Sequence, residues 1–516
     1  MSMKKYLSIL SILSISFYAL KAQTPDDALR NGWFIPGGSA RNMAIGGAMG
    51  SLGGDITANN INPAGIGLYK TSEITLSPGF MLNNNKLNYR GDNSTQSQTA
   101  FAYGASGFIA GASNTRGRNN WTSSAFSISI NQLASYNNHI HYKGSNNISS
   151  FSEQYLEELT RDGAGVQAAE QNYIFGSSLA YRTYLIDSIN NNGQLIGYRT
   201  LVPISSGTVQ ENDEKTTGGY HEISIAFAGN MEDKLYLGAS INIPLSFYTR
   251  SLTYTETDAS GDLDNNFGYS AFTENLKSFG VGINAKFGLI YRTPKSLRLG
   301  LAIHTPSFMS FTDHIRAAMT TNTEQYAGTL TESSDNLNNG SAGERKYNEL
   351  TPWRIIGSLS FVLHEVQDTR LQKGFITADV EYVSYRGSRF YTISDENGYS
   401  PLPGDYYDAL NNSVKDYLKG AFNFRMGGEL KFDTWLFRLG GAFYGSPYDD
   451  PQLKAHRILA SGGIGYLNHG YFIDVTLAHT FNQDVNFPYR LADKPNTFAT
   501  SKNNLSNVII TFGFKI

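Results

Sequence analysis

The sequence predicts an all-β protein, a 14-stranded antiparallel transmembrane β-barrel with an N-terminal plug in its lumen. Three observations predict this fold: a secretory signal at the N-terminus, long segments of alternating apolar and polar residues, and an even number of such segments joined by alternately short and long connections. The composition agrees, because 52 Gly, 32 Tyr and 30 Phe suit many strands with aromatic girdles.

Residues 1–22 have the layout of a secretory signal peptide. Lys4 and Lys5 precede an apolar, serine-dotted stretch from Tyr6 to Leu20, and we expect cleavage after Ala22. An uncleaved anchor helix is the alternative, but the stretch is short for a helical span of roughly 20 apolar residues. No later window approaches that length, so we expect the mature chain to enter a membrane only as a closed barrel.

Charge, cysteine content and motifs exclude several classes. The 41 basic and 44 acidic residues nearly balance without a long run of one sign, so nothing favours nucleic acid as a partner. The chain has no cysteine, so it can form neither disulfides nor thiolate metal sites. No nucleophile elbow, phosphate loop or His-Glu-x-x-His motif occurs in a convincing context, so we expect neither an enzyme nor a cofactor.

Residues 23–70 are expected to form the plug. The runs 37–48, 53–55 and 62–67 are dense in glycine and other small residues, which suits neither a stable helix nor a charged linker. Small residues would allow the close backbone approach that a plug in a narrow lumen needs, and a proline turn would make it rigid.

Residues 71–516 are expected to form the barrel and its loops. In the clearest strand, Leu235 to Phe247, every second residue is apolar and the intervening residues are mainly small or polar. Charged residues occupy the second face of 418–431 and 434–445, which indicates a wet lumen and a lipid-facing exterior. The predicted strands are 71–82, 99–109, 122–135, 219–229, 234–250, 277–293, 297–312, 351–363, 373–387, 418–431, 434–445, 456–467, 470–482 and 505–516.

The connections alternate in length, as barrels with periplasmic turns and long extracellular loops require. Short turns fall at 230–233, 294–296, 432–433 and 468–469, whereas the longest loop covers 136–218. Within that loop, Tyr173 to Ile186 also looks like a strand; counting it would give an odd number, so we assign it to a loop element over the lumen.

The last strand ends in Phe512, Phe514 and Ile516, which resembles the terminal signal read by barrel-assembly machinery. An ordinary terminal strand of a soluble sheet is the alternative. The expected partners are therefore this machinery and outer-membrane lipid, and the expected location is the outer membrane of a Gram-negative bacterium.

The glycine-rich run that ends in Asn62-Pro63-Ala64-Gly65, just before the barrel, resembles the hatch of the FadL/TodX-type outer-membrane transporters. The resemblance covers the architecture of the mature chain, but residue-level similarity is confined to the hatch and, loosely, the last strand. It implies that Asn62, Pro63, Ala64 and Gly65 form a turn that blocks the lumen at rest. It also implies uptake of long-chain fatty acids or aromatic hydrocarbons. The longest loop departs from the family, so ligand-contacting residues cannot be carried over.

In that family the substrate leaves sideways through a gap in the barrel wall. Prolines cannot donate to a strand ladder, so Pro78-Gly79 in the first strand and Pro244 in the fifth are candidate wall distortions. An ordinary β-bulge at the rim is the alternative.

Charged residues on the lumen face could resemble an active site, but an interior ion-pair network that rigidifies the wall explains them better. These residues are Asp379, Glu381, Glu429, Arg425, Lys431 and Arg438. We expect no metal site; the candidates that come nearest are His139 and His141, which would share one face of a strand.

The leading hypothesis is passive, hatch-gated uptake of hydrophobic molecules such as long-chain fatty acids. One rival is a haemin receptor that uses His139 and His141 as axial ligands. A second rival is a non-transporting barrel scaffold for protein secretion or surface attachment.

Overall fold

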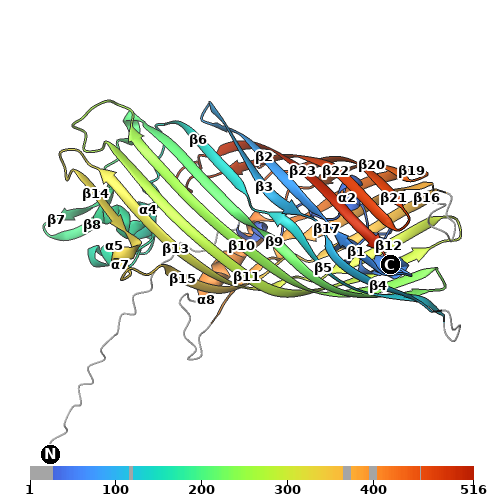
Figure 1. Ribbon diagram of the computed structural model, residues 1–516. Coiled ribbons are helices and arrows are strands. Elements are labelled where there is room, and N and C mark those ends of the chain that lie inside the picture. The colour runs from blue at the N-terminus through green and yellow to red at the C-terminus, as the bar shows by residue number, and fades with distance from the viewer. Residues whose placement is uncertain (1–26, 115–119, 364–372, 394–403, 452, 454) are drawn as a thin grey trace, which may run out of the picture.

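Fourteen antiparallel strands close into a barrel in the computed structural model, counting the residues it describes: 27–114, 120–363, 373–393, 404–451, 453 and 455–516 (Figure 1). The predicted signal peptide lies outside these residues. The wall closes where the first strand pairs with the last, as in Glu73 with Lys515. The uninterrupted strands are β9 (Thr208–Met231), β10 (Leu235–Asp258), β11 (Tyr269–Arg292), β19 (Gly420–Phe432), β20 (Trp435–Tyr444), β21 (Arg457–Asn468), β22 (Tyr471–Asn486) and β23 (Ala499–Lys515).

The remaining barrel strands are each broken into two pieces by a short irregular segment. They are β1 (Glu73–Leu76) with β2 (Pro78–Tyr89), β3 (Asp92–Tyr103) with β4 (Ser106–Ser113), β5 (Trp121–Ser135) with β6 (Asn138–Asn146), β12 (Leu297–His304) with β13 (Phe308–Asn322), β15 (Gly343–Leu350) with β16 (Arg354–Leu363), and β17 (Gly374–Ser384) with β18 (Arg389–Thr392). The 14-stranded antiparallel fold predicted from the sequence is therefore confirmed.

The outer face of the barrel is apolar and the inner face is polar. On β10, Leu237 and Ile241 are 39 % and 60 % exposed, whereas Ser240 and Asn242 are 2 % and 0 % exposed. This belt ends at Phe247, beyond which the outward residues of β10 are serine and threonine. Aromatic pairs such as Trp435–Tyr466 and Phe247–Phe279 lie toward its two edges, as girdles at the two interfaces of a bilayer do. No helix among the described residues is long and apolar enough to cross a membrane.

The N-terminal segment lies inside the barrel. It contains α1 (Asp27–Arg30), α2 (Ala40–Ala44), α3 (Ala58–Ile61) and the 3-10 helix η1 (Pro63–Leu68). Helix α2 packs against β20 to β23, while η1 packs against β5 and β9 to β11, so the segment reaches opposite sides of the lumen.

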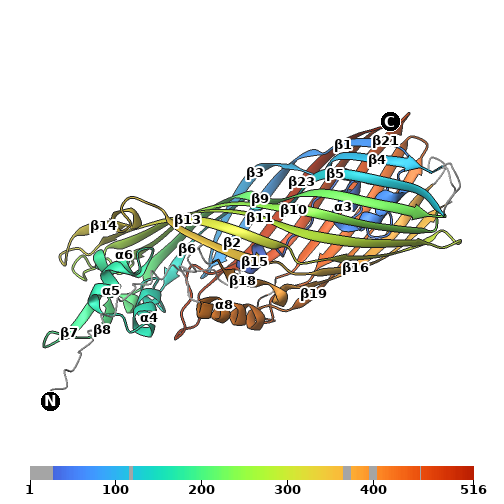
Figure 2. The ribbon, with the colours of Figure 1, turned by 90° about the horizontal axis from the view of Figure 1, so that it is seen from below.

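A cap of helices and short strands covers the end of the barrel away from the short turns (Figures 1 and 2). It comprises α4 (Glu153–Arg161), α5 (Val166–Gln171), α6 (Ser177–Arg182), the hairpin β7 (Ile186–Asn191) and β8 (Gln194–Thr200), η2 (Ile204–Ser206), β14 (Thr329–Ser333) and α7 (Ser334–Leu337). The segment Tyr173 to Ile186 belongs to this cap and contains α6. The long loop covers residues 147–207, shorter than the predicted 136–218, because β6 pairs with β9 over Asn138–Asn146.

A separate helix, α8 (Gly404–Tyr417), follows β18 and the 3-10 helix η4 (Tyr385–Gly387), and lies beside the barrel mouth (Figure 2). Its buried residues Tyr407, Leu410 and Val414 belong to the same apolar cluster as Leu29 and Trp33 of the N-terminal segment. Helix α8 therefore covers the N-terminal segment from the long-loop side.

Candidate functional site: a hatch, a lumen chamber and a break in the wall

The turn predicted at Asn62-Pro63-Ala64-Gly65 fixes the plug to the wall. The Asn62 Oδ1 accepts a hydrogen bond from the Ala64 backbone N–H (3.1 Å), and its Nδ2 donates to the carbonyl oxygens of Gly50 (2.6 Å) and Leu289 (3.2 Å). Pro63 occupies the first position of η1, where its missing N–H costs no hydrogen bond. One side chain thus ties two parts of the plug to β11.

Glycines on the inner wall let the plug approach closely. A Cβ added at Gly238 would overlap the backbone of Pro63 and Ala64, and one added at Gly288 would overlap the Asn62 side chain. The plug therefore rests against bare backbone on β10 and β11, which accounts for small residues on both sides of the contact.

Ion pairs line the lumen beside the plug. Arg438 binds Glu429 (2.6 Å) and Asp474 (2.5 Å), and Arg425 lies 3.7 Å from both Asp379 and Glu381. The network predicted from the sequence is thus confirmed for Asp379, Glu381, Arg425, Glu429 and Arg438. It also holds the plug, because Asp379 accepts from the Gly50 N–H (3.1 Å) and Glu429 lies 3.5 Å from Arg41.

A cluster of packed apolar side chains, which we call the lumen chamber, joins the N-terminal segment, the wall and α8. Trp33 and Phe34 belong to it, and wall arginines stack on both rings: Arg457 at 3.8 Å from the Trp33 centroid and Arg354 at 4.9 Å from that of Phe34. Its other buried members include Leu29, Leu133, Tyr220, Met309, Phe311, Tyr347 and Val383. A cavity of about 60 Å³ is lined by Phe34 and other apolar side chains and by polar residues, among them Glu222, Lys286 and His304.

The barrel wall is broken next to this chamber. Strand β4 pairs with β5 as far as Ser106 with Ile130, but beyond that point β3 pairs only with β2, and β6 only with β9. No ladder joins β3 to β5 or β6 in the described strands, and side chains close the interval instead. Ser94 of β3, for example, donates to the His141 carbonyl oxygen of β6 (2.5 Å). We call this interval the wall break.

The prolines chosen from the sequence both lie at wall irregularities. Pro78 follows the interruption between β1 and β2 and pairs with Tyr103, the last residue of β3, so Pro78-Gly79 lies beside the wall break. The ladder between β10 and β11 omits Ile243 and Pro244, although Pro244 still pairs with Glu222 of β9. Gly104 lies between β3 and β4, next to Tyr103, which pairs with Pro78. The sequence did not predict this interruption, because the alternation of 99–109 continues through it.

His139 and His141 share one face of β6, as predicted, and each contacts a carboxylate. His139 Nε2 lies 2.7 Å from Asp213 Oδ1, and His141 Nε2 lies 2.8 Å from Glu211 Oε1. The described residues contain no group of three or more His, Cys, Asp or Glu side chains placed to hold a metal ion.

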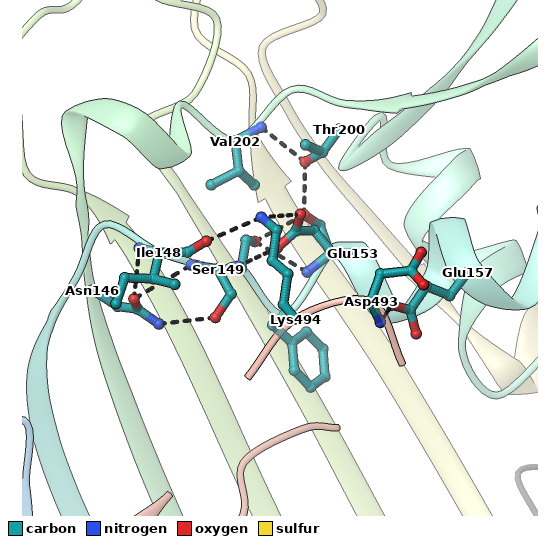
Figure 3. A network of polar contacts seen from close by, with 12 residues as sticks. Asn146, Ile148, Ser149, Glu153, Glu157, Thr200, Val202, Asp493 and Lys494 are labelled. Carbon is teal, nitrogen blue, oxygen red and sulfur yellow. Dashed lines mark hydrogen bonds and ion pairs between the residues drawn. The ribbon is translucent and has the colours of Figure 1, made fainter. Parts of the chain in front are cut away.

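The cap is joined to the barrel by polar contacts. Lys494, from the loop between β22 and β23, donates to the Ile148 carbonyl oxygen (3.0 Å) and binds Glu153 of α4 (2.7 Å), while Glu157 accepts from the backbone N–H of Asp493 (3.2 Å; Figure 3). The loop and α4 are thereby held together.

A buried carboxyl lies beneath this contact. Glu256 accepts from Ser150 Oγ (2.6 Å), from the Phe151 N–H (3.0 Å) and from Gln210. It stands beyond Phe247, where the apolar belt ends, and burial raises its pKa to about 7.

These features define a class of protein: a 14-stranded barrel with an apolar outer face, whose N-terminal segment lies in the lumen and packs into an apolar cluster there. The chain has the barrel fold of the FadL/TodX-type structures. It is similar to a Pseudomonas aeruginosa FadL homologue, at 14 % identity over 93 % of this chain and 99 % of the other, with a TM-score of 0.52. It is also similar to the P. putida toluene transporter TodX, at 11 % identity over 94 % and 99 %, with a TM-score of 0.51. No protein-family model and no curated protein matches the sequence.

Proposed function

We propose that the protein is an outer-membrane transporter for passive uptake of hydrophobic small molecules, with long-chain fatty acids as the first substrate class to test. The observation that carries the proposal is the lumen chamber, a buried apolar site inside a barrel whose outer face is apolar. The descriptions of two similar structures, a FadL homologue and a toluene transporter, support it. Residence in a Gram-negative outer membrane, in contact with its lipid, and recognition of the last strand by barrel-assembly machinery belong to the same proposal.

Residues 23–70 serve as the hatch in this proposal. Asn62, Pro63, Ala64 and Gly65 keep it seated against β10 and β11, so the lumen is blocked at rest. Cargo enters past the cap, occupies the lumen chamber in place of Trp33 and Phe34, and leaves sideways through the wall break. The break supports this exit because Leu133 lines the chamber and also lies in β5 at its edge. A downstream sink that keeps the gradient is a sufficient energy source.

The test is uptake of tritiated oleate and radiolabelled toluene by otherwise identical cells with and without the gene. Faster uptake of either compound with the gene supports transport and identifies the substrate class. If cells that express the gene take up each compound no faster than cells without it, transport is contradicted and the non-transporting scaffold is favoured. The haemin receptor has less support, because both imidazoles contact carboxylates; absence of a Soret shift on haemin titration would eliminate it.

A further inference from the structure

Two lysines face each other on the outer surface of the barrel, where its first and last strands join. Lys86 of β2 and Lys502 of β23 are directly opposite in the ladder that closes the wall (Figure 1). Both are exposed, whereas the adjacent Asn85 and Ser501 are only 2 % and 7 % exposed, so the lysines point outward. Like charges directly opposite on neighbouring strands destabilise a sheet. The pair therefore costs stability unless an anion neutralises it.

The protein supplies no anion for this pair. No outward position of β2, β3, β22 or β23 holds an acidic residue, and no ion pair among the described residues involves either lysine. Gln483 of β22 pairs with Lys502, and Thr95 of β3 pairs with Lys86; both of these neighbours are exposed. We call Gln483, Lys502, Lys86 and Thr95 the lysine row. All four side chains can donate hydrogen bonds to one oxyanion on the outer surface.

The lysine row lies just beyond the apolar belt. On β2, Leu82 is 49 % exposed, and Lys86 is the second outward residue after it, about 13 Å farther along the strand. On β22, the exposed Phe481 is the outward residue immediately before Gln483. Lysine side chains are long enough to bend back toward an apolar surface while the ammonium group stays polar-solvated. The row is therefore at the level of lipid headgroups.

The lysine row is at the end of the barrel that carries the cap. Strands β2 and β3 join at the turn Arg90-Gly91, and Arg90 Nε donates to the carbonyl oxygen of Ser145, near the end of β6. The long loop 147–207 of the cap begins directly after β6. Long loops of outer-membrane barrels face the outside of the cell, so the headgroups that meet the row belong to the outer leaflet.

We propose that the lysine row binds a phosphate group of the phosphorylated glycolipid that forms the outer leaflet of a Gram-negative outer membrane. The phosphate bridges Lys86 and Lys502, while Thr95 and Gln483 donate to its remaining oxygens. A phosphate monoester carries about −1.5 to −2 charges at neutral pH, which offsets both ammonium groups, whereas the phosphodiester of an ordinary phospholipid carries about −1. The acyl chains lie against the apolar belt below the row.

The bound phosphate also strengthens the seam of the barrel, because Lys86 and Lys502 belong to its first and last strands. This inference rests on the outer-membrane residence in the proposed function and goes beyond transport. It assigns to the outer surface a lipid site that is separate from the lumen.

Binding of ³²P-labelled lipid A to the purified protein in dodecyl maltoside micelles tests the site. Lys86→Gln with Lys502→Gln removes both charges, and Lys86→Arg with Lys502→Arg keeps them. The matched control is Lys143→Gln with Lys346→Gln, which also removes two exposed outward lysines. Each control lysine already pairs with a glutamate, at 3.1 Å and 2.8 Å. Competitors are dephosphorylated lipid A, inorganic phosphate and phosphatidylglycerol.

We expect the double glutamine variant of the row to bind lipid A at least tenfold more weakly than the wild type. The control and the double arginine variant should bind like the wild type, and each competitor should be at least tenfold less effective than unlabelled lipid A. Equal affinity of the wild type and the double glutamine variant would overturn the site. Inorganic phosphate or phosphatidylglycerol that competes as well as lipid A would overturn its assignment to the glycolipid.

Urea unfolding in the same micelles tests the seam. Lipid A should raise the midpoint of the wild type and of the control, but not that of Lys86→Gln with Lys502→Gln. Without lipid A this variant should be at least as stable as the wild type, because the repulsion between the lysines is gone. Lower stability of the variant without lipid A would contradict the repulsion.

The outcome for transport is separate. A protein that binds lipid A through the row but takes up neither oleate nor toluene overturns transport and leaves the lipid site standing. Cell fractionation that finds the protein outside the outer membrane would overturn both proposals.

Discussion

The Arg457 guanidinium lies 3.8 Å from the centre of the Trp33 ring, and its Nη1 donates to the Trp33 carbonyl oxygen at 2.9 Å. A charged side chain of the wall thus holds both the ring and the backbone of the N-terminal segment. Of the four tryptophans, Trp33 is buried, whereas Trp121, Trp353 and Trp435 are 39 % to 50 % exposed on the outer face. Displacement of the segment should therefore be visible in the emission of Trp33.

Addition of oleate to the purified protein should change the tryptophan emission, because a ligand in the lumen chamber separates Trp33 from Arg457. Trp33→Phe should abolish that change. Trp33→Ala should tighten oleate binding about tenfold, or about 1.4 kcal/mol, since a competing occupant has been removed. Fluorescence titration of the wild type and Trp33→Phe measures the first effect, and equilibrium binding of tritiated oleate to the wild type and Trp33→Ala measures the second. Equal affinities would show that Trp33 does not occupy the ligand position.

Asn62→Ala should loosen the hatch. The change removes the donor to the carbonyl oxygens of Gly50 and Leu289, and buried groups left without partners cost about 1–3 kcal/mol. We expect a higher conductance for small ions in planar bilayers. Asn88→Ala, on the exposed end of β2, is the matched control. A conductance equal to that of the control would argue against Asn62 as the residue that seats the hatch.

The barrel could be predicted from the sequence because each strand alternates residues that face lipid, such as Leu237, with residues that face the lumen, such as Ser240. This pattern can be recognised within one short segment. Past the apolar belt the residues of β9 before Gly219 are mostly polar on both faces, so the outer parts of β9 and β6 carry little period-two signal, and the sequence predicts a loop there. The wall break could not be predicted, because Tyr103 and Gly104 continue a good strand pattern. Two features distant in sequence accompany the end of the ladder there. One is the register shift of β5 between Gln132 and Ala134, and the other is the close approach of Gly38 to Gly104.

Arg438→Met should destabilise the barrel strongly. It leaves the buried carboxylates of Glu429 and Asp474 without their cation, and breaking a buried pair in this way costs about 3–5 kcal/mol. Lys234→Met, which removes an exposed partner of Glu232, should cost about 1 kcal/mol at most. Urea unfolding in lipid vesicles compares the two. Adding Glu429→Gln and Asp474→Asn to Arg438→Met should recover part of the loss.

Docking of the cap should weaken as pH rises. Burial raises the pKa of Glu256 to about 7 from its ordinary value of 4.5, so between these values the undocked state releases a proton while the docked state keeps it. Docking is therefore strongest below pH 4.5, declines through the window, and levels off above pH 7, with a total loss of about 3 kcal/mol. The rate of protease cleavage within 147–207, followed from pH 4 to pH 8, measures this. Glu256→Gln cannot ionise and should remove the slope; a slope that persists in this variant would assign the pH dependence to another group.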